Sequence, residues 1–209
     1  MMNRRMVLMG TAATIGAFAL PARSQQVLTV GLIPSEDSRA MIANSQAMMD
    51  MLSKALGMPV KPFVAADYNG VIEALRSKRL DVAYLGPFSY VLGTTVADIE
   101  AFAVAETKKA GRTFYHSLVV ARKDSGIKTV ADLKGKTFAF GAPSSTSGSL
   151  MPRYFLQQAG INPDKDFKNV AFSGAHDATV AFVASGKVEA GVLNASVWEK
   201  LVEQKKVDT

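Results

Sequence analysis

The 209-residue sequence contains no cysteine, two histidines and one tryptophan. Without cysteine, the chain can form no disulfide, no thiol nucleophile and no cysteine-ligated metal centre, and it cannot carry a lipid on a cysteine after signal cleavage. The two histidines, His116 and His176, stand at unrelated positions, which argues against a structural zinc site. We therefore expect a protein that uses neither a metal nor another cofactor.

The first two dozen residues differ in composition from the rest. Arg4 and Arg5 precede an apolar stretch from Met6 to Leu20, and a small-x-small cleavage site ends at Ser24. This order predicts a secretory signal peptide over residues 1–24, which is too short to span a bilayer as a stable helix. The paired arginines leave the general and the twin-arginine export routes open. An uncleaved N-terminal anchor is the alternative.

The basic character of the chain comes partly from that leader. Residues 1–24 hold three of the 24 basic residues and no acid, so 21 basic residues face 18 acidic ones in the remainder. Basic residues are scattered there, which predicts no nucleic-acid partner. An exported chain without a lipid anchor indicates a freely diffusing protein of the periplasm, and we expect a monomer.

Strand-like and helix-like segments alternate along the rest of the chain, which predicts an α/β fold with a largely parallel sheet. The predicted strands are 27–33, 60–64, 81–85, 101–105, 114–121, 137–140, 170–172 and 188–193. The predicted helices are 37–56, 68–78, a short one from 87, 130–133, 148–159, 176–185 and 195–204. We expect strand 81–85 to be buried and strand 114–121 to run from one domain into the next. We expect Met48, Met49, Met51 and Leu52 to pack in the core.

The turn between predicted strand 137–140 and predicted helix 148–159 is rich in hydroxyl groups. It reads Pro-Ser-Ser-Thr-Ser-Gly over residues 143–148. A helix N-terminus offers free amide groups and about half a positive charge, so hydroxyl donors placed there suit a small oxyanion. Plain N-capping is the alternative, since serine and threonine are preferred caps. Capping needs one such residue, and four stand here.

Other turns between a predicted strand and the next helix carry neutral donors as well. Ser35, Tyr68 and His176 each stand in such a turn, and none of these turns contains Arg or Lys. Ligands of open α/β sheets bind where these helix starts converge. An anion there would be held by oriented dipoles and hydrogen bonds instead of a cation. Taken singly, Tyr68 could merely cover a helix end, and His176 could be a neighbour of a cap.

Four segments together resemble a known family. They are Asp67-Tyr68, the run Asp81 to Leu92, the run Ser144 to Gly148 and the run Gly174 to Thr179. In this order they are similar to the phosphonate- and phosphite-binding proteins of ABC importers. The resemblance implies a type II two-lobe periplasmic binding protein fold, with lobe 1 over residues 25–116 and lobe 2 over residues 117–209. It also implies a protein that is not an enzyme, which encloses its ligand between the lobes and delivers it to a membrane permease.

Carried over by position, the resemblance implies a set of ligand-binding residues. With the serine of the first turn included, they are Ser35, Tyr68, Ser145, Thr146, Ser147 and His176. Two further pocket positions depart from the family pattern. Leu85 stands where the family usually has an aromatic residue. Near the position of Asn194 the family often has an acidic residue, which this sequence lacks. Both departures favour a small ligand without an ammonium group, such as phosphite, phosphate or a simple alkylphosphonate.

Family members continue beyond the position of Thr209 and return to complete lobe 1. We therefore expect this sequence to be truncated at its C-terminus, with lobe 1 incomplete. Two other functions remain open. One is a secreted serine hydrolase using a serine and His176, although no Gly-x-Ser-x-Gly elbow and no orienting acid are evident. The other is a sensory oxyanion-binding domain of the same fold.

Overall fold

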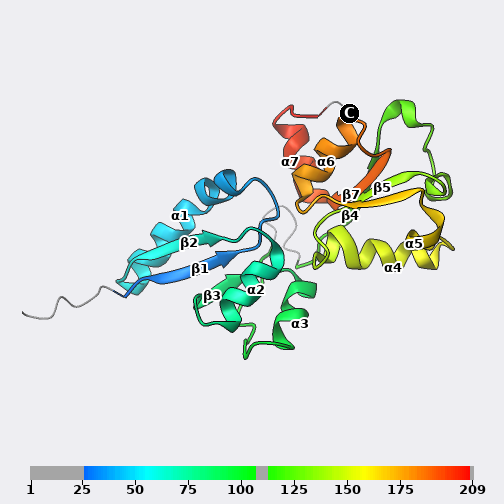
Figure 1. Cartoon of the computed structure of the whole chain (residues 1–209). Helices are drawn as coiled ribbons and strands as arrows, with labels where there is room; N and C mark the ends of the chain where they lie inside the picture. Colours follow the sequence, from blue (N-terminus) through cyan, green and yellow to red (C-terminus); the bar gives the residue numbers. More distant parts are fainter. Residues whose placement is uncertain (1–25, 107–112, 208–209) are drawn as a thin grey trace, which may run out of the picture.

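The computed structural model describes residues 26–106 and 113–207. The predicted signal peptide, residues 1–24, lies outside them. Two α/β units follow one another along the chain, each built on its own sheet (Figure 1). Within these described ranges, no helix is both long and apolar enough to cross a bilayer.

The first unit, here called the first lobe, is built on a parallel three-stranded sheet with the order β2-β1-β3. Its strands are β1 (Leu28–Leu32), β2 (Val60–Val64) and β3 (Val82–Tyr84). Its helices are α1 (Ser38–Leu56), α2 (Tyr68–Arg76) and α3 (Pro87–Thr94). Parallel strands need such crossovers, and they place every helix start at the same edge of the sheet.

The second unit, the second lobe, has a four-stranded sheet with the order β4-β7-β5-β6. Its strands are β4 (Ser117–Ala121), β5 (Thr137–Phe140), β6 (Asn169–Phe172) and β7 (Ala190–Asn194). Its helices are η1 (Lys123–Ser125), η2 (Val130–Leu133), the π-helical turn η3 (Thr146–Leu150), α4 (Met151–Gln158), α5 (Pro163–Asp166), α6 (His176–Ala184) and α7 (Ala195–Glu203). Only β4 runs antiparallel, beside β7.

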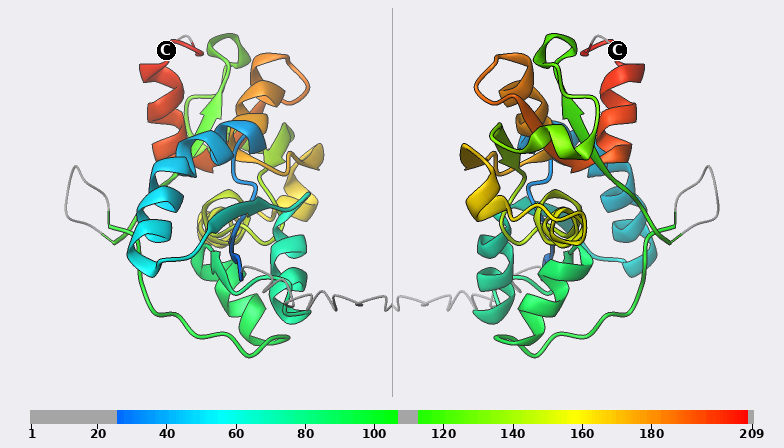
Figure 2. Two further views of the ribbon diagram at one scale, coloured as in Figure 1. Left: turned by 90° about the vertical axis from the view of Figure 1, so that its left-hand side faces the viewer. Right: turned by 90° about the vertical axis from the view of Figure 1, so that its right-hand side faces the viewer.

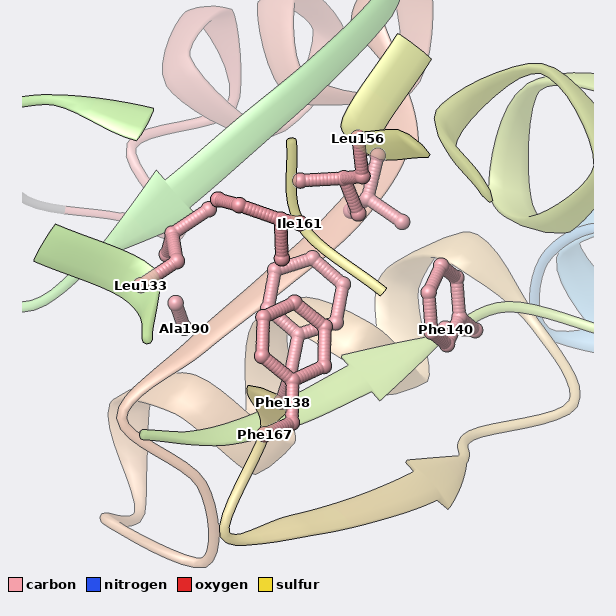
Figure 3. Close-up of a cluster of buried hydrophobic side chains, with 8 residues drawn as sticks. Leu133, Phe138, Phe140, Leu156, Ile161, Phe167 and Ala190 are labelled. Atoms are coloured by element: carbon pink, nitrogen blue, oxygen red, sulfur yellow. The ribbon is translucent and has the colours of Figure 1, made fainter. Parts of the chain in front are cut away.

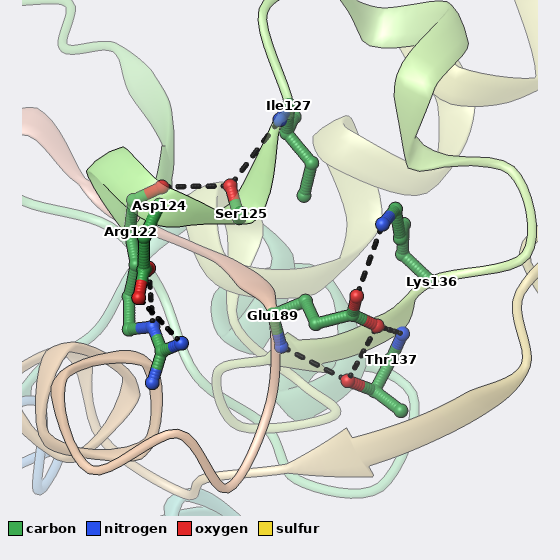
Figure 4. Close-up of polar contacts among 7 residues, drawn as sticks. All are labelled: Arg122, Asp124, Ser125, Ile127, Lys136, Thr137 and Glu189. Atoms are coloured by element: carbon green, nitrogen blue, oxygen red, sulfur yellow. Dashed lines mark hydrogen bonds and ion pairs between the residues drawn. The ribbon is translucent and has the colours of Figure 1, made fainter.

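The core of the second lobe gathers around β5. Phe138 and Phe140 are fully buried, and the Phe138 ring stacks on Phe167 with centroids 4.8 Å apart (Figure 3). A central parallel strand is covered on both faces, which explains its continuous apolar sequence. Beside β5, the Glu189 carboxylate accepts the Thr137 amide at 3.0 Å and the Lys136 ammonium at 3.1 Å, and so joins the start of β7 to β5 (Figure 4).

Several helix starts are fixed by local capping. Asp37 accepts the Ala40 amide at 2.9 Å at the start of α1, and Asp67 accepts the Gly70 amide at 2.7 Å at the start of α2. Pro87 occupies the first turn of α3, where its fixed φ favours the helix. Substituting such a cap costs about 1 kcal/mol, enough to decide where a helix begins.

Three predictions of local structure are wrong. Residues 101–105 form no strand: they run without regular structure along the outside of the molecule, and Phe102 is 80% exposed (Figure 2). A strand needs a paired neighbour, and none of the described strands pairs with this segment. Predicted strand 81–85 is a three-residue edge strand, with Tyr84 exposed. Of the methionine cluster, Met49 is buried, whereas Met48 and Met51 are exposed.

Candidate functional site

The hydroxyl-rich turn forms the start of the longest helical segment in the second lobe. The π-helical turn η3 begins at Thr146, two residues earlier than predicted, and continues directly into α4. Ser145 is the N-cap, and its Oγ accepts the Gly148 amide at 3.1 Å. Single π-turns are frequent at functional sites. We call residues 144–147 the hydroxyl turn.

Two amide donors at the start of η3 are free. The amides of Ser145, Gly148, Ser149 and Leu150 all donate within the turn or to its flanks. Those of Thr146 and Ser147 donate to no acceptor among the described residues. Free amides at the positive end of a helix dipole form a site for an anion.

Close packing sets the position of the hydroxyl turn. Gly148 lies against Gly141 at the end of β5, and a Cβ added at Gly148 would stand 3.1 Å from the Gly141 Cα. The same Cβ would stand 3.2 Å from Cε1 of His176. Glycine at this position therefore lets the helix start approach both β5 and the imidazole.

Tyr68 reaches the hydroxyl turn from the first lobe. It is the first residue of α2, is 3% exposed, and shares a side-chain hydrogen bond with Ser145. Burial raises the pKa of Tyr68 to about 12, an effect that the Ser145 bond opposes and nearby Tyr115 reinforces. The phenol is therefore a neutral donor at all physiological pH values.

His176 lies on the other side of the same turn, at the start of α6. Its side chain is buried, and Nδ1 accepts the Asn194 amide at 3.3 Å. That bond places the proton of the neutral ring on Nε2. Burial lowers the pKa of His176 to about 4, against a smaller opposite effect of Asp177. Like Tyr68, the imidazole is a neutral donor near pH 7.

Tyr115 belongs to this site and was missed by the sequence analysis. It shares a side-chain hydrogen bond with Thr146, and burial raises the pKa of its phenol, as does its neighbour Tyr84. Thr146 Oγ1 also accepts the amide of Phe88, at the start of α3, at 2.9 Å. Tyr115 precedes β4 and stands in no strand-to-helix turn, so a search restricted to such turns does not find it.

Two cavities flank the hydroxyl turn. The larger, about 630 Å³, is lined by Tyr68 and Ser144, and four acids share its wall: Glu36, Asp37, Asp67 and Asp177. The smaller, about 400 Å³, is lined by Thr146, Ser147 and Tyr115, and its described lining contains no Asp, Glu, Lys or Arg. A carboxylate at roughly 4–8 Å repels a bound anion by about 2–4 kcal/mol at an effective dielectric of ~20. The smaller cavity is therefore the better place for an oxyanion, despite its size.

Of the predicted site residues, only Thr146 and Ser147 line that cavity. Tyr68 lines the larger cavity, and the others line neither one: Ser35, Leu85, Ser145, His176 and Asn194. Ser35 accepts the His176 amide at 2.8 Å through its carbonyl. Leu85 packs against the buried cluster of the first lobe. The Asn194 side chain caps α7, accepting the Ser196 amide at 2.9 Å, so only its backbone supports the site.

The geometry does not form a hydrolase triad. His176 Nδ1 is occupied by the Asn194 amide. The Asp177 carboxylate accepts the amides of Asp37 and Ala178, both at 2.8 Å, and so does not orient the imidazole. Among the described residues, no group of three or more metal-ligating side chains is placed to hold a metal ion.

Comparison with known proteins places the chain in a family. Residues 30–209 match the family described as "ABC transporter, phosphonate, periplasmic substrate-binding protein". The "Probable ABC transporter phosphite binding protein PhnD1" of Prochlorococcus marinus is 35% identical over 208 residues, covering 95% of this chain and 69% of that protein. The "Phosphonates-binding periplasmic protein" of Escherichia coli is 30% identical, covering 92% of this chain and 58% of that protein.

Solved structures agree with these matches. The binding protein component of an ABC phosphonate transporter from Pseudomonas aeruginosa superposes with a TM-score of 0.81 at 30% identity, covering 87% of this chain and 61% of that one. PhnD1 in complex with methylphosphonate superposes with a TM-score of 0.78 at 34% identity, covering 86% of this chain and 68% of that one.

These comparisons confirm the expected two-lobe binding-protein fold, and they confirm the expectation of a binding protein instead of an enzyme. The chain spans between 54% and 69% of the length of the curated relatives it matches. It belongs to the periplasmic substrate-binding proteins of ABC phosphonate transporters.

Proposed function

We propose that the protein is the solute-binding component of an ABC importer, and that it captures a small tetrahedral oxyanion between its lobes. The ligand class is phosphite, phosphate or a simple alkylphosphonate. Family membership supports the importer role, and the related PhnD1 has been solved with methylphosphonate.

The two free amides of Thr146 and Ser147 carry this proposal. They stand at a helix start on the wall of the smaller cavity, where the phenol of Tyr115 adds a third donor. Backbone amides bind phosphoryl oxygens without any side-chain cation. We assign the head-group contacts to Tyr115, Thr146 and Ser147, which line that cavity. We propose that Tyr68, Ser145 and His176, which do not line it, complete the donor set from around the hydroxyl turn.

The remaining wall of the smaller cavity indicates the substituent on the ligand. Its apolar part is formed by Pro87, Phe114, Met151 and Phe155, beside Thr113, His116 and Ser117. An ammonium group buried there would lack a carboxylate partner among the described lining residues, and an unpaired buried charge is costly. Hydrogen or a short alkyl group on phosphorus fits this wall better than an aminoalkyl chain does.

The cellular setting is also part of the proposal. We place the lobe boundary between His116 and Ser117 and expect residues 1–24 to direct export to the periplasm, by the general or the twin-arginine route. There the protein would act as a monomer, deliver its ligand to an inner-membrane permease, and bind no nucleic acid.

Calorimetric titration tests the ligand assignment. We expect heat with phosphite or methylphosphonate and much weaker binding of 2-aminoethylphosphonate. Tyr115→Phe should weaken binding about tenfold, because it removes a hydrogen bond to a charged group. The matched control is Tyr154→Phe, an exposed phenol on α4, which should bind as the wild type does. Absence of heat with all these anions, or a Tyr115→Phe variant of unchanged affinity, would contradict the assignment.

A further inference from the structure

The lobes also meet away from the smaller cavity, where the turn between β1 and α1 reaches α6 and α7 (Figure 1). The Ser35 carbonyl accepts the His176 amide, and the Asp177 carboxylate accepts the Asp37 amide, each at 2.8 Å. The second bond joins the starts of α1 and α6. Both bonds use backbone groups of the first lobe, so they depend on how the lobes sit and not on the side chains of that turn.

An ion pair completes this contact. Lys200 on α7 donates to the Glu36 carboxylate at 2.6 Å, and the two side chains are 34% and 21% exposed. Glu36 stands between Ser35 and Asp37, so each of three consecutive residues of the first lobe makes a contact with the second lobe. Neither Glu36 nor Lys200 lines the smaller cavity.

We propose that residues 35–37, with their partners on α6 and α7, form a latch that favours the closed arrangement of the lobes even without ligand. This inference rests on the proposed function, since it concerns how the same site closes. A ligand that binds only the closed form has an apparent dissociation constant equal to the intrinsic one divided by the closed fraction. The latch therefore raises affinity without touching the ligand, and it holds the start of α6, which carries His176.

The test removes the ion pair and measures closure directly. Because the chain has no cysteine, cysteines introduced at exposed Lys61 and Lys165, one in each lobe, can be labelled selectively for interlobe distance measurement. In the ligand-free protein, Lys200→Met should shift the distance distribution toward longer values. Glu36→Gln should do the same. Each should weaken methylphosphonate binding about two- to fivefold, the range for a partly exposed ion pair.

Controls separate the pair from general charge effects. Lys206→Met removes the same charge just beyond the same helix and should change neither closure nor affinity. The double variant at positions 36 and 200 should be no weaker than either single variant, because both break one contact. Additive losses, or single variants that match Lys206→Met in both measurements, would overturn the latch.

The two proposals fail in different ways. If the wild type binds no oxyanion yet Lys200→Met still opens the ligand-free protein, the latch stands and the proposed function falls. If methylphosphonate binds but neither single variant changes the distances, the function stands and the latch is refuted.

Discussion

Burial of His176 makes the stability of the protein depend on pH in a defined window. Its folded-state pKa is lowered to about 4 from an ordinary value of 6.5, chiefly by burial. Between these two values, the unfolded chain binds a proton that the folded protein excludes, so the free energy of unfolding falls as the pH falls. The full difference of about 2.5 pKa units corresponds to about 3 kcal/mol. Between about pH 7 and about pH 5, the expected loss is about 2 kcal/mol.

Urea unfolding at a series of pH values measures this effect. The comparison is with His176→Gln, which keeps a polar side chain but cannot take up a proton. All other titrating groups, His116 included, are common to both proteins, so their contributions cancel in the difference. The stability advantage of the wild type over the variant should therefore shrink by about 2 kcal/mol from about pH 7 to about pH 5.

Equal pH dependence in the two proteins would refute this reasoning. An independent readout is the carbon-bound proton resonance of the His176 ring, which should keep its neutral position down to about pH 5. A titration midpoint near the ordinary value would show that the ring is solvated in the folded state, and the assignment of a neutral Nε2 donor would fall with it.

Two further substitutions test the packing. Phe138→Ala should lower the free energy of unfolding by about 3–5 kcal/mol, because it leaves a cavity in a fully buried cluster. The control is Phe102→Ala, at a side chain 80% exposed. Its free energy of unfolding should stay within about 0.5 kcal/mol of the wild-type value in the same urea assay. Gly148→Ala should cost about 1–3 kcal/mol and weaken methylphosphonate binding, since its Cβ would stand 3.0 Å from Ser145 Oγ and 3.1 Å from the Gly141 Cα. A Gly148→Ala variant with the stability and affinity of the wild type would show that the close approach at Gly141 is not needed.

Local signals were sufficient for the elements whose ends are marked in the sequence. Helix α1 begins after its cap Asp37 and ends at Gly57, whose φ of 65° suits glycine. The strands at 60–64 and 137–140 were predicted with the bounds that the structure shows. Predictions are wrong where the structure of a segment depends on a pairing partner elsewhere in the chain. Residues 101–105 have the apolar composition of a strand but pair with none of the described strands.

The site was predictable to the extent that it is built from helix starts. Tyr68, the hydroxyl turn and His176 all stand at such starts, and the structure brings them together. The contributions of Ser35 and Asn194 are made by backbone groups, which carry no residue-type signal. Tyr115 comes from the segment between the lobes, and its approach to Thr146 depends on how the lobes close.

The neutrality of the donors determines what the site can sense. Burial moves the pKa of Tyr68 up to about 12 and that of His176 down to about 4, so both side chains keep their protons unchanged between about pH 5 and about pH 9. These two side chains therefore add no change of charge to the site over this range, and they impose no pH dependence of their own on binding. A cation in the same position would attract every anion at long range. Fixed neutral donors act only at hydrogen-bonding distance, so the site selects its anion by the geometry of the oxygens.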